Sequence, residues 1–205
     1  MYRFLLFLSV LGILSCKNEN LPTKITLLEN WEFKGVDTLE WQTASVPGTI
    51  FSDLMDQKMI ENPFVKTNED SVQWVSKKKW EYKTTFYLST KQLEKKNIEL
   101  HFEGLDTYAT IYLNDSIIFK VNNAFKKYII DIKKSAKAKN NVRVVFENFN
   151  DIELEKETEI WYQLPVKNRV FTRKAQFQYG WDWGPIFNSC GIWKDVYLKT
   201  WDDAI

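Results

Sequence analysis

The feature that most limits what this chain can fold into is a series of short segments in which apolar and polar residues alternate. They recur about every ten residues through the middle of the sequence, at 80–86, 98–102, 108–113, 117–121, 128–132 and 142–146. Side chains alternate between the two faces of a β-strand, so each segment predicts a strand with one buried face. Residues 24–33 predict an opening strand. Short strands at this spacing indicate an all-β fold, a jelly-roll-like β-sandwich.

One segment breaks the alternating pattern. It follows the turn signal Val46-Pro47-Gly48, and its apolar residues recur at helical spacing: Ile50, Phe51, Leu54, Met55 and Met59. The spacing predicts one short helix over about 49–59, which ends before the Asn62-Pro63 pair. The sequence therefore predicts a sandwich of about eight strands with a single short helix.

The composition excludes several classes of protein. Aromatic residues make up 16% of the chain, which excludes an intrinsically disordered chain. The 28 basic residues are balanced by 27 acidic ones, without the basic excess of a nucleic-acid-binding protein. The chain has one His and two Cys, too few for a zinc site built from these ligands. We therefore expect no metal, no cofactor and no nucleic-acid partner.

The N-terminus has the features of a targeting segment. A basic residue, Arg3, precedes the apolar stretch 4–14, which is shorter than the roughly 20 residues of a transmembrane helix. The stretch ends in Ile13-Leu14-Ser15-Cys16, which resembles a bacterial lipobox. This predicts a lipoprotein signal peptide over 1–15, lipidation of Cys16 and a polar tether over 16–23. The protein is then expected on the bacterial cell envelope, anchored by lipid; the alternative is an ordinary signal peptide.

Two further residues have reactive side chains, and each has a structural interpretation. With Cys16 acylated, Cys190 has no partner for a disulfide, and we expect it to be a half-buried structural residue. A Ser-His-Asp hydrolase would have to use the single His, His101. It alternates with Leu100 and Phe102 in a predicted strand, so we expect a surface or inter-sheet residue on the opposite face.

The most distinctive chemistry lies in the last third of the chain. Trp181-Asp182-Trp183 is bracketed by Gly180 and Gly184-Pro185, and glycines permit a turning backbone that can push side chains outward. A Trp face packs on the apolar C–H face of a sugar, and a carboxylate accepts charge-assisted hydrogen bonds from sugar hydroxyls. Arg173 could orient a carboxylate or a sugar hydroxyl. These residues predict a sugar site; alternatively, the two Trp residues belong to the core, Asp182 caps a turn and Arg173 is a surface charge.

The same region resembles a known family. Arg173-Lys174, the run Gly180–Pro185 and then Gly191-Ile192-Trp193-Lys194 occur in this order in the N-terminal sugar-binding domain of glycoside hydrolase family 2 β-mannosidases. Residues 100–114 resemble the central hairpin of that domain, and Val46-Pro47-Gly48 fits its turn before a short helix. We expect Trp193 to lie in an alternating strand as a core residue.

The resemblance implies a galactose-binding-domain-like sandwich over 24–201. It implies that the chain is the N-terminal domain or a fragment of an enzyme that hydrolyses terminal non-reducing β-D-mannose residues from β-mannosides. The substrate-binding residues would be Trp181, Asp182, Trp183 and Arg173. The partners would be a β-mannoside oligosaccharide, the membrane through the lipid, and downstream immunoglobulin-like and barrel domains. A β-galactosidase or β-glucuronidase specificity fits the Trp-Asp-Trp-Gly-Pro run less well.

The catalytic residues of such an enzyme are not expected in this sequence. Retaining glycosidases use two carboxyl groups about 5–5.5 Å apart. In the resembling enzymes both are glutamates of a (β/α)₈ barrel that lies downstream of this domain. The acidic segment 153–159 is interpreted as a solvated charged stretch, so we expect the 205 residues alone to be inactive. Two alternatives stay open: a stand-alone carbohydrate-binding lipoprotein without catalysis, and a structural lipoprotein domain with no ligand.

Overall fold

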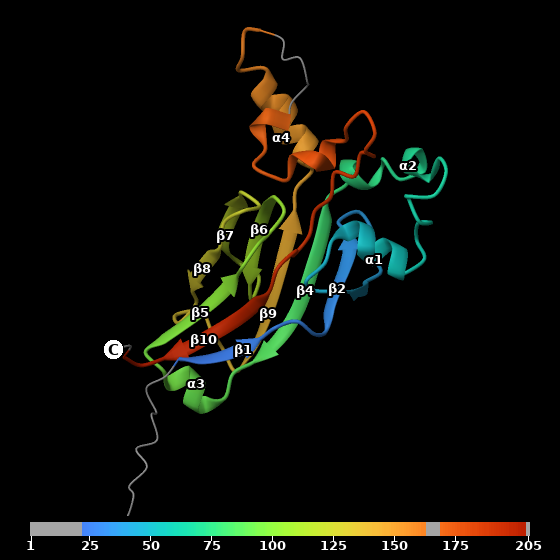
Figure 1. Ribbon diagram of the computed structural model, residues 1–205. Helices are drawn as coiled ribbons and strands as arrows, with labels where there is room; N and C mark the ends of the chain where they lie inside the picture. Colours follow the sequence, from blue (N-terminus) through green and yellow to red (C-terminus); the bar gives the residue numbers. More distant parts are fainter. Residues whose placement is uncertain (1–21, 163–168, 204–205) are drawn as a thin grey trace, which may run out of the picture.

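Two antiparallel sheets form the body of the computed structural model, which describes residues 22–162 and 169–203 (Figure 1). The four-stranded sheet has the order β1 (Thr23–Thr26), β10 (Val196–Trp201), β5 (Asn97–Phe102) and β8 (Tyr128–Asp131). The six-stranded sheet has the order β3 (Gln42–Ala44), β2 (Trp31–Gly35), β4 (Trp80–Tyr87), β9 (Lys139–Phe146), β6 (Tyr108–Leu113) and β7 (Ser116–Asn122). The last strand, β10, pairs with both β1 and β5, so the two ends of the domain are joined in one sheet. The predicted β-sandwich is confirmed.

The core lies between the sheets and explains the alternating pattern. Three of the four inward positions of β4 are aromatic, the fourth being Thr84, and the Tyr82 ring lies 6.0 Å from Phe33 of β2 and 5.6 Å from Phe146 of β9. From the other sheet, Leu100 and Phe102 of β5 are fully buried. Burying one such side chain stabilises the fold by about 1.5–3 kcal/mol. Most of the inward positions of these strands are therefore apolar.

The predicted helix is α1 (Ile50–Asp56), and its start is determined by a capping box. The Thr49 hydroxyl accepts a hydrogen bond from the Ser52 backbone N–H, and the Ser52 hydroxyl accepts one from the Thr49 backbone N–H. The helix buries Ile50 and Leu54 against the sandwich. It ends three residues before the predicted boundary, where Lys58 adopts a positive φ of 56°.

The prediction of a single helix is wrong. The structure also has α2 (Asn68–Ser71), α3 (Thr90–Glu94), α4 (Phe149–Glu157) and the 3₁₀ turns η1 (Val75–Lys77), η2 (Arg169–Phe171) and η3 (Gln176–Tyr179). Helix α4 extends from the end of the sandwich where β9 finishes (Figure 1). It buries only Phe149 and Glu153, so it has no apolar stripe at helical spacing that the sequence could reveal. The acidic segment is therefore not wholly solvated, because Glu153 is buried.

Cys190 and His101 both have structural surroundings, although His101 is more buried than the predicted surface residue. Cys190 is buried and free, and burial raises the pKa of its thiol far above the usual value. His101 lies on the face of β5 opposite Leu100 and Phe102, stacked on Tyr197 with ring centroids 4.7 Å apart. Its Nε2 atom is 2.8 Å from a Glu99 carboxylate oxygen, and the imidazole is buried rather than at the surface.

The predicted signal peptide over 1–15 and Cys16 lie outside the described residues. Strand β1 begins at Thr23, the last residue of the predicted tether. Among the helices of the described ranges, none is long and apolar enough to cross a membrane.

Candidate functional site

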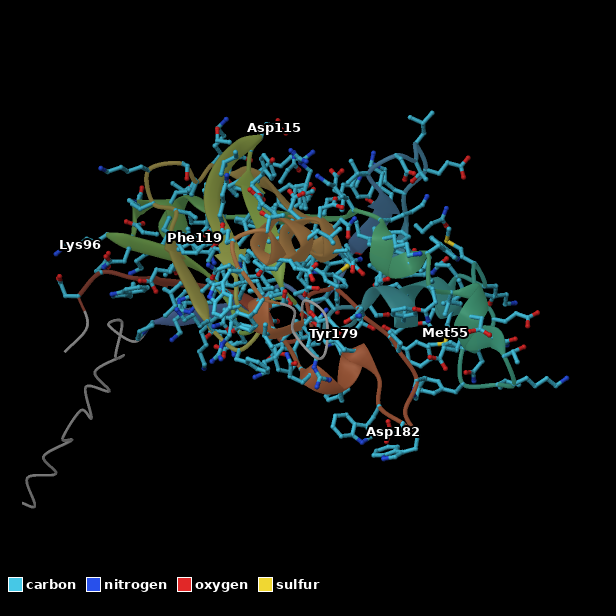
Figure 2. The ribbon with its side chains drawn as sticks, turned by 90° about the horizontal axis from the view of Figure 1, so that it is seen from above. Met55, Lys96, Asp115, Phe119, Tyr179 and Asp182 are labelled. Atoms are coloured by element: carbon cyan, nitrogen blue, oxygen red, sulfur yellow. The ribbon has the colours of Figure 1, made fainter. Side chains whose placement is uncertain are left out.

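Trp181, Asp182 and Trp183 lie at the tip of a short hairpin. The Trp181 N–H donates to the Gly184 carbonyl at 3.0 Å, and the Gly184 N–H donates back to the Trp181 carbonyl at 3.1 Å. Trp181 is 64% exposed and Trp183 is 87% exposed. In Figure 2, Asp182 lies at the outer edge of the molecule, away from both sheets. The alternative in which these Trp residues belong to the core is therefore wrong.

The backbone needs glycine where the hairpin begins. Gly180 has a φ of 80°, and a Cβ atom there would lie 2.5 Å from the Ile186 side chain. Any other residue would have an unfavourable backbone conformation there, and its Cβ atom would lie too close to Ile186. The Asp182 carboxylate forms no hydrogen bond or ion pair with the described residues, so it does not cap the turn. The hairpin thus presents to solvent two indole faces and one carboxylate that has no partner among residues 22–162 and 169–203.

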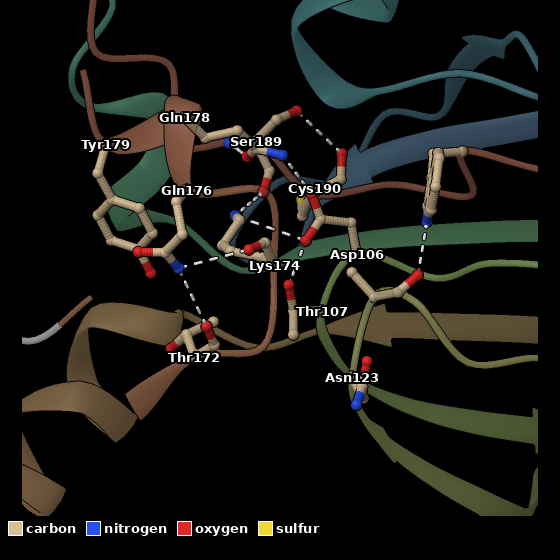
Figure 3. Close-up of polar contacts among 12 residues, drawn as sticks. Asp106, Thr107, Asn123, Thr172, Lys174, Gln176, Gln178, Tyr179, Ser189 and Cys190 are labelled. Atoms are coloured by element: carbon tan, nitrogen blue, oxygen red, sulfur yellow. Dashed lines mark hydrogen bonds and ion pairs between the residues drawn. The ribbon is translucent and has the colours of Figure 1, made fainter. Parts of the chain in front are cut away.

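A buried polar network holds the root of this hairpin (Figure 3). The Gln178 side chain accepts a hydrogen bond from the Ser189 N–H at 2.9 Å and donates to the Asp106 carboxylate at 2.7 Å. The Lys174 ammonium group donates to the Ser189 carbonyl at 2.6 Å and lies 3.6 Å from Asp106. Residues 174–178 and 189 therefore meet over Asp106, which comes from the loop between β5 and β6.

Lys174 is the least expected member of this network. Its side chain is fully buried, with the ammonium group 4.5 Å from the Phe149 ring. Burial lowers the pKa of Lys174 below its usual value, and the negative charge of Asp106 partly opposes that shift. The sequence places Lys174 beside the exposed Arg173, and no local pattern distinguishes the buried cation from the solvated one.

A second buried carboxylate, Glu153 of α4, supports the segment before the hairpin. It accepts hydrogen bonds from the hydroxyl groups of Thr172 and Tyr179. The pKa of the Tyr179 phenol lies far above its usual value. Burial is the largest cause, and the hydrogen bond and negative charge of Glu153 add to it. Helix α4 therefore contributes an acceptor that fixes Tyr179, the residue immediately before Gly180.

The structure places Arg173 at the surface and corrects the prediction for Trp193. Arg173 is exposed, and its backbone carbonyl accepts from the Ala124 N–H at 2.9 Å. The guanidinium group of Arg169 lies 5.9 Å from the centroid of the Trp181 ring. The prediction of Trp193 as a core strand residue is wrong, because it is half-buried before β10 begins. Its indole N–H donates to the Ala124 carbonyl at 3.1 Å.

An apolar cavity of about 530 Å³ lies beside the hairpin root. Six aromatic residues contribute to its wall: Phe51, Phe64, Phe125, Phe177, Phe187 and Trp193. Its polar groups include those of Asp106 and Gln178, so the network beneath the hairpin also borders the cavity. None of the three hairpin-tip residues is part of the wall. Over the described part of the chain there is no cluster of three or more potential metal ligands.

The two antiparallel sheets with a shared core give the chain the architecture of a galactose-binding-like β-sandwich domain. The chain belongs to the glycosyl hydrolase 2 galactose-binding domain-like family, which it matches over residues 31–194. The resemblance drawn from the motifs is confirmed.

Relatives with matching sequences include several that are named β-mannosidases. The β-mannosidase of Capra hircus is 33% identical across 87% of this chain, and β-mannosidase B of Thermothelomyces thermophilus is 32% identical across 88%. The chain spans 22% of the length of each. The crystal structure of a β-D-mannosidase from Dictyoglomus thermophilum superposes with a TM-score of 0.84 at 38% identity, over 88% of this chain and 23% of that one. A β-glucuronidase from an uncultured Clostridium sp., at 19% identity and a TM-score of 0.59, shares the fold alone.

Proposed function

We propose that this chain is the N-terminal domain of a retaining β-mannosidase. In that enzyme it would help to form the pocket for the terminal non-reducing β-D-mannose residue of a β-mannoside. The observation that carries the proposal is the exposed Trp181-Asp182-Trp183 tip on a hairpin fixed at its root. The names of the relatives that match most of this chain support the same assignment.

The chemistry of the tip suits a sugar ligand. An indole face packs on the apolar C–H face of a pyranose, and the Asp182 carboxylate accepts hydrogen bonds from two adjacent hydroxyl groups. Because Asp182 has no partner among the described residues, no internal bond has to break before a sugar binds. Both the Trp faces and the carboxylate are directed outward by the same turn, so one ligand can contact them together.

In this proposal the domain binds and orients the sugar, and other domains of the enzyme carry out the chemistry. Retaining hydrolysis needs an acid/base and a nucleophilic carboxyl group about 5–5.5 Å apart. The buried carboxylates near the hairpin, Asp106 and Glu153, are already committed to hydrogen bonds within the fold. The family resemblance implies that the reacting pair belongs to a barrel domain that follows an immunoglobulin-like one. Lipidation of Cys16 would anchor the enzyme to the bacterial cell envelope.

Hydrolysis measurements test this proposal. The β-mannosidase polypeptide that carries this domain should hydrolyse p-nitrophenyl β-mannoside faster than the matching β-galactoside and β-glucuronide. The 205-residue chain alone should show no turnover. Equal or greater activity on the other two glycosides would contradict the mannosidase assignment. Turnover by the isolated chain would contradict the claim that other domains carry the catalytic residues. Tight binding of mannobiose by a chain with no catalytic extension would favour the stand-alone binding module.

A further inference from the structure

We propose that Gln178, supported by Asp106 and Lys174, is a positioning residue that sets where the Trp181–Trp183 tip meets the sugar. The inference rests on the proposed function, because it concerns how accurately the same tip is placed. Gln178 itself does not touch the ligand in this account. Its effect on the reaction passes through Asp182 and the flanking indoles.

Gln178 connects the two legs of the hairpin. Its backbone carbonyl accepts from the Phe187 N–H at 3.0 Å, and its side-chain carbonyl accepts from the Ser189 N–H at 2.9 Å. Both of these donors lie on the segment that follows the tip, the returning leg. Gln178 lies on the segment that precedes the tip, the outgoing leg. The side-chain amide therefore fixes the separation and register of the legs below the tip.

The remaining half of the same amide attaches the hairpin to the sandwich. The Gln178 NH₂ group donates to the Asp106 carboxylate at 2.7 Å (Figure 3). Since a carboxylate is only an acceptor and a backbone N–H is only a donor, the amide has one orientation that satisfies both neighbours. Asp106 is itself held by two backbone hydrogen bonds with Gly191, at 3.0 and 3.1 Å. The hairpin is thus attached to a part of the domain that is itself held by backbone hydrogen bonds.

Lys174 makes this attachment possible in a buried place. Asp106 is 6% exposed, and a buried carboxylate needs both hydrogen bonds and a nearby positive charge. The fully buried Lys174 ammonium group supplies the charge at 3.6 Å and also donates to the Ser189 carbonyl. Ser189 therefore receives contacts from both Gln178 and Lys174, and the base of the returning leg is fixed at two atoms.

The tip depends on this root for its placement. Between Gly180 and Pro185, the legs are joined only by the two Trp181–Gly184 backbone bonds, and the tip side chains are exposed. A second support, from Glu69 and Gln73 to the backbone of Ile186, holds the returning leg alone. A displacement of about 1 Å at a substrate-positioning group can lower a rate by about 100-fold. Loosening Gln178 should therefore reduce activity without removing any ligand contact.

A double-mutant cycle in the β-mannosidase that carries this domain tests the inference. Gln178→Ala and Asp182→Ala are compared singly and together, with kcat/KM referred to the folded fraction. Gln178→Ala should lower kcat/KM by about 10-fold in the wild-type background and by less than about 3-fold when Asp182 is already Ala. This loss of additivity is expected because Gln178 acts through the tip. If the Ala variant does not fold, Gln178→Met replaces it in the cycle. Methionine keeps the length of the side chain and removes both hydrogen bonds of the side-chain amide.

Asn97→Ala is the matched control. The Asn97 amide also bridges two backbone groups, the carbonyls of Trp201 and Asp202, but at the C-terminal end of β10 away from the hairpin. It should lower Tm while leaving kcat/KM of the folded fraction within about 2-fold.

Three results would overturn the inference. If Gln178→Ala reduces kcat/KM equally in both backgrounds, it does not act through the tip. If it leaves kcat/KM unchanged while Asp182→Ala impairs it, positioning is rejected and the proposed function stands. If Asp182→Ala itself has no effect, the proposed role of the tip fails, and positioning fails with it.

Discussion

Removing the charge of Lys174 should destabilise the domain more than removing any exposed lysine. The Lys174 side chain is fully buried, so Lys174→Met leaves the Asp106 carboxylate inside the protein without its cation and the Ser189 carbonyl without its donor. Breaking a buried ion pair by removing one partner costs about 3–5 kcal/mol. Asp106 keeps its hydrogen bond from Gln178, so we expect a loss near the lower end of this range. For a domain of this size, a loss of about 3–5 kcal/mol corresponds to a fall in Tm of roughly 6–20 °C.

Urea unfolding followed by circular dichroism measures this loss directly. The matched control is Lys83→Met, which removes an ion pair with Glu32 of similar length, 3.1 Å, whose two side chains are 36% and 46% exposed. An exposed pair contributes about 0–1 kcal/mol, so the control should unfold close to wild type. If Lys174→Met also stays within 1 kcal/mol of wild type, the buried pair does not stabilise the hairpin root as argued.

Three other predictions concern separate parts of the chain. Burial raises the pKa of Asp53 from 3.8 to about 6, so the unfolding free energy should fall by about 3 kcal/mol as pH rises from about 4 to about 7. Asp53→Asn should abolish that slope in urea titrations, and a slope that persists would contradict the assignment. Gly191 has a φ of 150°, and a Cβ atom there would lie 2.8 Å from the Gly48 carbonyl oxygen, so Gly191→Ala should cost about 2–4 kcal/mol. Gly184→Ala, whose Cβ would meet only ordinary contacts, should cost less than about 1 kcal/mol, and equal losses would refute the steric argument. Cys16→Ser should abolish palmitate labelling and membrane association, and equal labelling of the variant would rule out the lipobox.

The strands could be predicted because their burial repeats every second residue. Trp80, Tyr82 and Phe86 of β4 alternate with more polar residues, and this local pattern survives in the fold. Helix α4 could not be predicted in the same way, since it buries one aromatic residue and one glutamate and has no apolar stripe. Trp193 shows the opposite error: an apolar residue in an alternating sequence lies outside the strand and borders the cavity.

The hairpin tip could be found from sequence, but its support could not. Trp181-Asp182-Trp183 is contiguous, and its composition alone indicates a sugar site. Asp106, in contrast, lies 72 residues from Gln178, with which it forms a hydrogen bond, and nothing near either residue indicates the contact. Lys174 and Arg173 are adjacent cations with opposite environments, one buried and one exposed. Their roles follow from the tertiary arrangement, because the backbone of residues 172–174 turns one side chain inward and the next outward.

The central claim is that Asp182 contacts the sugar, and one paired measurement tests it. In the full-length β-mannosidase that we propose carries this domain, kcat/KM on p-nitrophenyl β-mannoside and Tm are measured for wild type, Asp182→Ala and Asp182→Asn. Losing a hydrogen bond to a charged group costs about 1.5–3 kcal/mol, so Asp182→Ala should lower kcat/KM by roughly 10- to 150-fold with Tm near wild type. Asp182→Asn should recover only part of the loss, since an amide oxygen is a weaker acceptor. A lower Tm with wild-type kcat/KM in the folded fraction would contradict the claim.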